Sequence, residues 1–166
     1  MGRDKARLPF RGSDLVSTVA SAVTCATGSA TLIGHPVLPS LPDRYPGEGP
    51  LGGILTALQD CMTDCCLVVA CDMPEIDAAF LTRLVDKAAQ FPGTVILPYG
   101  PDGLAQPLCA VYPRGALAVM EAHFAAGIRK VTAALAGVAV EPLRVPELSI
   151  FQNVNTPEDW AAYAAK

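Results

Sequence analysis

The run CCLVVACDMP, residues 65–74, constrains the fold more than any other part of the sequence. Five apolar residues, Cys66 to Ala70, follow one another without polar alternation, which is typical of a strand covered on both faces. The run then ends at Asp72 and Pro74. Because a strand of this kind needs a covering layer on each side, the run predicts a layered α/β domain.

The rest of the chain alternates helical patterns with further short apolar runs. Helices are predicted at residues 13–26, 49–62, 77–91, 114–127, 128–137 and 156–166, and strands at residues 30–33, 93–100, 107–113, 140–146 and 149–155. This alternation favours a mostly parallel sheet, and the length favours one domain over residues 1–166.

The composition argues against several classes of function. The chain is 51% hydrophobic and 17% charged, as in a compact globular domain, and its net charge of -4 disfavours nucleic acid as a partner. No apolar run reaches the ~18 residues of a membrane span, and no apolar segment of a signal peptide follows the charged first residues. We therefore expect a cytoplasmic protein with no membrane partner.

Six cysteines agree with a reducing compartment. Their spacings match no zinc motif, so buried, reduced thiols are expected, with a metal or redox site as the alternative. They are Cys25, Cys61, Cys65, Cys66, Cys71 and Cys109.

Asp72 is the first candidate for chemistry. Ligands of open α/β sheets bind at the carboxyl ends of strands, and Asp72 directly follows the buried run. A carboxylate suits Mg²⁺, which takes oxygen ligands and is often shared with substrate phosphates. The alternative is that Asp72 caps the helix that follows Pro74.

Two loops are candidates for phosphate contacts. The opening stretch MGRDKARLPFRG carries Arg3 and Lys5, which can deliver cations to a polyphosphate or form a solvated charged surface. The stretch GEGPLGG, residues 47–53, opens a helix with four glycines, which let a backbone approach a ligand closely or simply form a turn.

The stretch FQNVNTPED brings two amides into an extended segment. Asn153 and Asn155 would point the same way there and could contact a metal or substrate, while Asn155 or Thr156 could cap the last helix. His35 and His123 stand alone, so a nucleophilic triad is not supported.

Four stretches in the same order resemble the molybdenum-cofactor guanylyltransferases. MGRDKARLPF resembles the second half of their signature L-A-G-G-x-S-x-R-M-G-x-D-K-x-x-L, GEGPLGGI their G-P-L-x-G-I element, VVACDMPEI their C-D-x-P element and FQNVNTPEDW their N-x-N-T-P-E-D element. The resemblance covers residues 1 to about 160. It implies a Rossmann-like, three-layer α/β nucleotidyltransferase that transfers GMP from GTP to molybdenum-bound molybdopterin and releases pyrophosphate.

The resemblance also implies roles for individual residues. Lys5 would contact the nucleotide phosphates, Asp72 would hold Mg²⁺, and Asn153 and Asn155 would lie near the metal and the pterin. The remaining residues implied to bind the nucleotide are Gly34, Asp43, Gly49, Leu51 and Gly52. Molybdenum-cofactor biosynthesis proteins or chaperones of target enzymes are the protein partners that the resemblance suggests.

The sequence departs from that family at its beginning. The first strand of the family and its L-A-G-G loop are absent upstream of Met1, so we expect an N-terminally truncated form of the fold, with Met1 an internal methionine of a longer chain. A degenerate copy with little catalysis is the alternative. A cytidylyltransferase, another small nucleotidyltransferase or a non-catalytic nucleotide-binding module also remain open.

Overall fold

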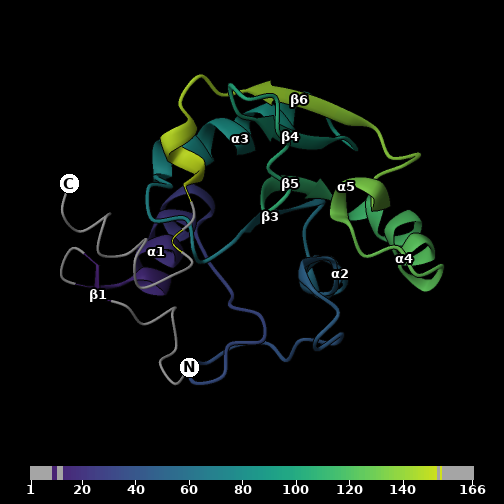
Figure 1. The fold of residues 1–166 in the computed structure, drawn as a ribbon, viewed down its shortest axis with the longest axis horizontal. Helices are drawn as coiled ribbons and strands as arrows, with labels where there is room; N and C mark the ends of the chain where they lie inside the picture. The colour runs from purple at the N-terminus through teal and green to yellow at the C-terminus, as the bar shows by residue number, and fades with distance from the viewer. Residues whose placement is uncertain (1–8, 11–12, 153, 155–166) are drawn as a thin grey trace.

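The computed structural model describes residues 9–10, 13–152 and 154 (Figure 1). In chain order the elements are β1 (Pro9–Phe10), β2 (Ser13–Asp14), α1 (Leu15–Thr27), α2 (Pro50–Asp60), β3 (Cys65–Val69), α3 (Ala78–Gln90), β4 (Val95–Tyr99), β5 (Cys109–Pro113), η2 (Arg114–Ala116), α4 (Leu117–Ala125), α5 (Val131–Ala134), β6 (Val140–Arg144) and η3 (Leu148–Phe151).

A four-stranded sheet in the order β3-β5-β4-β6 organises the molecule. Strands β3, β4 and β6 run in the same direction, and β5 runs against its neighbours β3 and β4. The reason lies in the sequence between β4 and β5, because residues 100–108 contain no crossover helix and a parallel return needs one. The layered α/β fold is thus confirmed. Three of the four strands share one direction, but because β5 is reversed the sheet is mixed, with antiparallel pairs at β3-β5 and β5-β4 and one parallel pair at β4-β6.

Helices cover both faces of the sheet, which gives the three layers visible in Figure 1. Side chains of α2, α4 and α5 share one core with Ala110 and Tyr112 of β5. Side chains of α3 share the other core with Cys109 and Val111 of β5, and partly buried side chains of α1 pack against the edge of that core. Successive residues of β5 therefore point to opposite faces, and both faces are apolar, as an unbroken apolar run predicts.

Local sequence signals explain where the helices begin. Asp14 caps α1, since its side chain accepts a hydrogen bond from the Ser17 N–H at 2.7 Å. Asp77 caps α3 in the same way, through the Phe80 N–H at 2.7 Å. Helix α2 begins with Pro50 in its first turn and has Gly49 as its cap residue.

Three predicted elements differ from the structure. Residues 30–33 form only an isolated bridge between Ile33 and Leu41, because the proline-rich segment that follows cannot continue a ladder. Residues 148–151 form the 3-10 helix η3 where a strand was predicted. The predicted helix at residues 128–137 shrinks to α5, and the predicted closing helix at residues 156–166 lies outside the described residues.

The prediction of uniformly buried thiols is wrong. Cys109 is buried, but Cys25, Cys65 and Cys71 are exposed. Burial raises the pKa of Cys66 and of Cys109 to about 12, because a thiolate is poorly solvated in either place.

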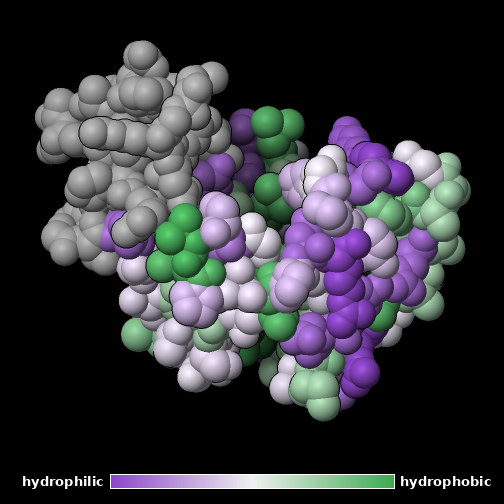
Figure 2. Space-filling model, turned by 90° about the horizontal axis from the view of Figure 1, so that it is seen from below, coloured by the Kyte–Doolittle hydropathy of each residue, from purple (hydrophilic) through white to green (hydrophobic). Residues whose placement is uncertain are grey.

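The surface carries no broad apolar face in the view of Figure 2, which looks at the molecule from below Figure 1. Hydrophilic residues gather in a band on the right-hand half of that view, and apolar residues lie in smaller groups. Of the helices in the described part of the chain, none has both the length and the hydropathy that crossing a bilayer requires.

Candidate functional site

Asp72 lies just beyond the carboxyl end of β3. The Ala70 N–H donates to the Leu108 carbonyl at 2.7 Å, which extends the strand pairing by one residue before the chain turns away. Asp72 is half-buried, and its Oδ1 atom is buried. Because Asp77 rather than Asp72 caps α3, the capping alternative for Asp72 is wrong.

A hydrogen bond joins this strand end to the segment around Val154. The Val154 N–H donates to the Asp72 carbonyl oxygen at 3.0 Å, and the Val154 side chain is buried. Asn153 and Asn155, which flank Val154 in the sequence, lie outside the described residues, as do Arg3 and Lys5. The contact nonetheless brings two motifs together that are far apart in the sequence.

A second group of predicted residues meets around Asp43. The Gly34 backbone has a φ of 64°, and a Cβ atom there would lie 3.1 Å from the Asp43 Cβ. Asp43 Oδ1 accepts from the Tyr45 N–H at 2.9 Å and lies 3.2 Å from the Thr56 hydroxyl. Asp43 therefore fixes the loop that leads into α2, in addition to any contact with a ligand.

Thr56 connects that loop to α2 and is a residue that sequence reasoning missed. Its hydroxyl accepts from the Arg44 N–H at 3.1 Å and lies 3.0 Å from the Gly52 carbonyl oxygen. Thr56 is 1% exposed and sits on the same helix as the apolar residues Ile54, Leu55 and Leu58. A buried hydroxyl needs partners, so one threonine among these apolar residues was the available signal.

The glycine-rich turn presents backbone rather than side chains. Gly49 has a φ of 79°, and Gly52 packs so tightly that a Cβ would lie 2.8 Å from the Tyr45 Cβ. The Leu51 side chain is fully buried in the core below α2, so a contact between Leu51 and a ligand has to come from its main chain. The turn thus places the positive end of the α2 dipole at the surface, which favours an anionic or polar acceptor. Pro50 has no N–H there, and the Gly52 N–H already donates to the Gly49 carbonyl oxygen at 3.1 Å.

Gly34 and Asp43 thus lie together and are connected to α2 through Tyr45 and Thr56, while Gly49, Leu51 and Gly52 form the start of that helix. Asp72 and Val154 form a second contact at the end of β3. Within the described residues, no group of three or more His, Cys, Asp or Glu side chains is arranged to hold a metal ion.

The three-layer fold, with its acidic strand end and its exposed helix N-terminus, is that of the α/β nucleotidyltransferases. Two solved structures show the likeness of fold. Molybdopterin-guanine dinucleotide biosynthesis protein A from Archaeoglobus fulgidus superimposes with a TM-score of 0.72 at 23% identity, over 97% of this chain and 89% of that one. CMP:2-keto-3-deoxy-manno-octonic acid synthetase, solved with CTP, superimposes with a TM-score of 0.75 at 13% identity, over 97% of this chain and 90% of that one.

The chain belongs to the family described as the MobA-like NTP transferase domain, which matches residues 1–138. A probable molybdenum cofactor guanylyltransferase from Chloroflexus aggregans is 35% identical over 179 aligned positions, covering 95% of this chain and 84% of that protein. Another, from Methanothermobacter thermautotrophicus, is 34% identical, over 72% of this chain and 63% of its own length. Membership of this family confirms the resemblance that the four motifs indicated.

Proposed function

We propose that this protein transfers GMP from GTP to the phosphate of molybdenum-bound molybdopterin, which forms the guanine dinucleotide cofactor and releases pyrophosphate. The observation that carries the proposal is the hydrogen bond between Val154 and Asp72, because it joins the C-D-x-P and N-x-N elements at one strand end. The relatives named as probable molybdenum cofactor guanylyltransferases support the choice of GTP and molybdopterin.

The residues present fit Mg²⁺ as the metal. The Asp72 carboxylate offers oxygen atoms just beyond the strand end, one of which, Oδ1, is buried. This suits Mg²⁺, which usually keeps several waters and binds through one or two carboxylates plus substrate phosphates. Asp72 would hold the ion, with Asn153 and Asn155 as neighbours, and the bound ion would neutralise charge on the phosphates.

The remaining proposed residues would bind and align the nucleotide. Lys5 would pair with phosphate oxygens, and Gly34, Asp43 and the main chain of Gly49, Leu51 and Gly52 would hold the nucleotide at the start of α2. Attack of a phosphate oxygen on the α-phosphorus needs alignment and charge stabilisation more than a protein nucleophile. The proposal therefore needs neither of the two histidines. His35 Nδ1 accepts from the Leu38 N–H at 2.9 Å, and His123 Nδ1 lies 2.9 Å from the Ala134 carbonyl oxygen.

We further propose that residues 1–166 act as one nucleotidyltransferase domain in the cytoplasm. Its protein partners would be those that make molybdopterin or that deliver the finished cofactor to target enzymes. Nucleic acid and membranes are not among the proposed partners.

The test of the proposal is turnover of the purified chain with molybdopterin and Mg²⁺, with GTP or CTP as the nucleotide. We expect pyrophosphate release and formation of the guanine dinucleotide with GTP, and much slower reaction with CTP. Equal or faster turnover with CTP would assign the chain to cytidylyl transfer. Nucleotide binding without any turnover would make it a binding module.

A further inference from the structure

The loop that leads into α2 has little rigidity of its own. Gly47 and Gly49 both have left-handed backbones, with φ of 81° and 79°, and Glu48 stands between them. A Cβ atom at either glycine would meet nothing within 4 Å, so no neighbour packs against these two glycines, although Tyr45 and Glu48 lie close to Gly52 of α2. Gly49 also has no side chain with which to cap α2. Glycines lose more conformational entropy on ordering than other residues, so the loop needs external support.

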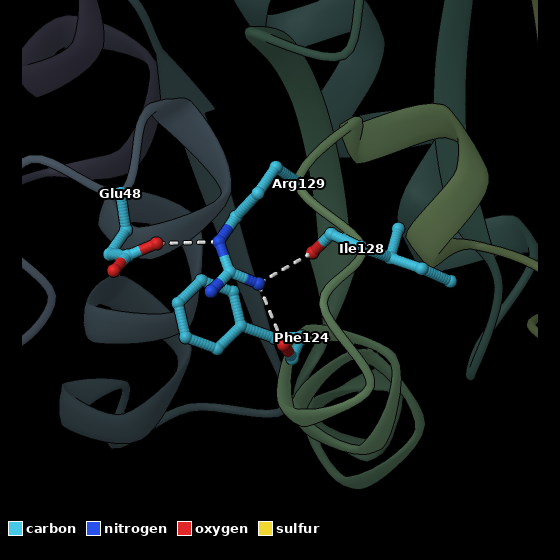
Figure 3. A network of polar contacts seen from close by, with 4 residues as sticks. All are labelled: Glu48, Phe124, Ile128 and Arg129. Carbon is cyan, nitrogen blue, oxygen red and sulfur yellow. Dashed lines mark hydrogen bonds and ion pairs between the residues drawn. The ribbon is translucent and has the colours of Figure 1, made fainter.

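Arg129 supplies that support from the far side of the loop (Figure 3). Its Nε atom donates to Glu48 Oε2 at 2.5 Å. Its Nη1 atom donates to the main-chain carbonyls of Phe124 and Ile128, at 2.7 and 3.2 Å. The guanidinium also lies over the Phe124 ring, 3.9 Å from the centroid. Main-chain acceptors and the ring thus fix the orientation of the guanidinium, and the guanidinium in turn fixes Glu48.

The other end of the loop is attached to helix α4, which precedes Arg129 in the chain. The Tyr45 ring packs edge-on against Phe124, with centroids 4.8 Å apart. The Tyr45 hydroxyl accepts from Gln59 Nε2 at 2.7 Å, and Gln59 Nε2 also donates to Glu121 Oε1 at 2.6 Å. Tyr45 and Glu48, on either side of Gly47, are therefore both held by residues of α4 or of the segment that follows it.

We propose that Arg129 is a positioning residue for the nucleotide: it holds Glu48 and so keeps the Gly47–Gly49 loop in the shape that receives the ligand. This inference rests on the proposed function, since it concerns the same site. Arg129 acts on the loop through Glu48 and Phe124, without a contact of its own to the nucleotide. An exposed ion pair contributes little to global stability, typically about 0–1 kcal/mol, so its effect should be seen in nucleotide affinity instead.

The experiment compares Arg129→Ala, Glu48→Ala and the double variant with the wild-type chain. The readouts are GTP affinity by titration calorimetry, KM and kcat for GTP, and the thermal midpoint. We expect each single change to raise the Kd and KM for GTP roughly 3–10-fold with kcat within about twofold. The double variant should be no weaker than either single variant, because both changes break the same connection. Arg129→Lys, which keeps the charge, should recover part of the affinity.

A second ion pair provides the matched control. Lys87 Nζ lies 2.8 Å from Glu141 Oε1 and 5.2 Å from the Phe91 ring centroid, so it too combines an ion pair with a cation over a ring. Lys87→Ala should leave GTP affinity unchanged. Hydrogen exchange at the Glu48 and Gly52 amides, which donate to Tyr45 and Gly49 carbonyls, should quicken in Arg129→Ala and not in Lys87→Ala.

Two results would overturn the inference alone. One is wild-type GTP affinity in Arg129→Ala, and the other is strictly additive losses in the double variant. A wild-type chain that binds no GTP would instead overturn the proposed function, and the inference with it.

Discussion

At the scale of single residues, Asp72 is held in place through its main chain. Its carbonyl oxygen accepts from Val154, and the cap of α3 comes from Asp77. Neither contact uses the Asp72 carboxylate, so removing its charge should leave both intact. An Asp72→Asn change therefore removes the charge while it keeps the main-chain hydrogen bond to Val154.

We predict that Asp72→Asn abolishes Mg²⁺-dependent turnover, with a loss of at least ~100-fold, because an amide cannot replace the negative charge that holds the ion. Initial rates over a Mg²⁺ titration measure the loss, and circular dichroism with a thermal melt checks the fold. Asp86→Asn, the same change at an exposed position on α3, should be silent. Unchanged turnover in Asp72→Asn would remove Asp72 from the metal site.

The sequence indicated Asp72 because a carboxylate directly after an apolar run is recognisable from the local sequence pattern alone. It did not indicate the pair of Glu48 and Arg129, which lie 81 positions apart and meet only when α4 packs beside α2. For Leu51 it indicated a residue that could contact a ligand, but not that the side chain would be buried and only the main chain available. Pairings and side-chain directions of this kind arise from tertiary packing, which no local pattern records.

At the scale of elements, α2 places two adjacent glycines in opposite surroundings. A Cβ at Gly52 would lie 2.8 Å from the Tyr45 Cβ and 3.0 Å from the Tyr45 carbonyl oxygen. A Cβ at Gly53, the next residue of the same helix, would meet nothing within 4 Å. Because Gly52 has no side chain, Tyr45 and the loop around it can pack directly against the first turn of α2.

The two glycines should respond to alanine with opposite signs. Gly52→Ala should lower the free energy of unfolding by about 1–3 kcal/mol, because Tyr45 has to move. Gly53→Ala should raise it by about 0.5–1 kcal/mol, because alanine costs less entropy in a helix. Urea unfolding of both variants measures the difference, and each serves as the control for the other. A stabilised Gly52→Ala variant would contradict the tight packing at that position.

Elements with strong periodicity were predicted well, and elements that depend on their neighbours were not. The apolar spacing of α1 and α3 and the apolar runs of β3, β4 and β5 were visible in the sequence. Residues 30–33 have a strand-like composition, but only Ile33 pairs, with Leu41, so the segment forms an isolated bridge and no strand. The reversed direction of β5 follows from a short connection, a signal that periodicity alone does not carry.

At the scale of the whole molecule, the two cores meet at the sheet, and titratable groups lie within both of them. Cys109 belongs to the core with α3, and Tyr112 to the core with α2. Burial raises the pKa of both groups, that of Cys109 to about 12. The Tyr112 hydroxyl also donates to the Pro107 carbonyl at 2.6 Å, a bond that only the neutral form can donate.

These raised pKa values make the fold sensitive to alkaline pH. The Cys109 thiol titrates near pH 9.0 when unfolded and near 12 when folded, so the unfolded state binds fewer protons between those values. Stability should therefore be nearly constant up to about pH 8 and then fall, with about 1.4 kcal/mol lost from Cys109 alone by pH 10. Urea unfolding under reducing conditions at pH 7, 9 and 10 measures the decline.

Cys109→Ala should show a shallower decline between pH 9 and 10 than the wild-type chain, whatever its stability at pH 7. Cys25→Ala, which changes an exposed thiol on α1, is the control and should retain the wild-type slope. Equal slopes for Cys109→Ala and wild type would mean that the thiol is solvated in the folded chain.

The hydrogen bond between Val154 and Asp72 also has a consequence for biosynthesis. Val154 follows every strand of the sheet in the sequence, so the ribosome makes the whole sheet before it makes this partner of Asp72. Because domains form as the chain emerges, the layers can assemble while the strand end still lacks its last contact. The contact between Val154 and Asp72 would thus form late in biosynthesis, after the scaffold that carries Asp72 already exists.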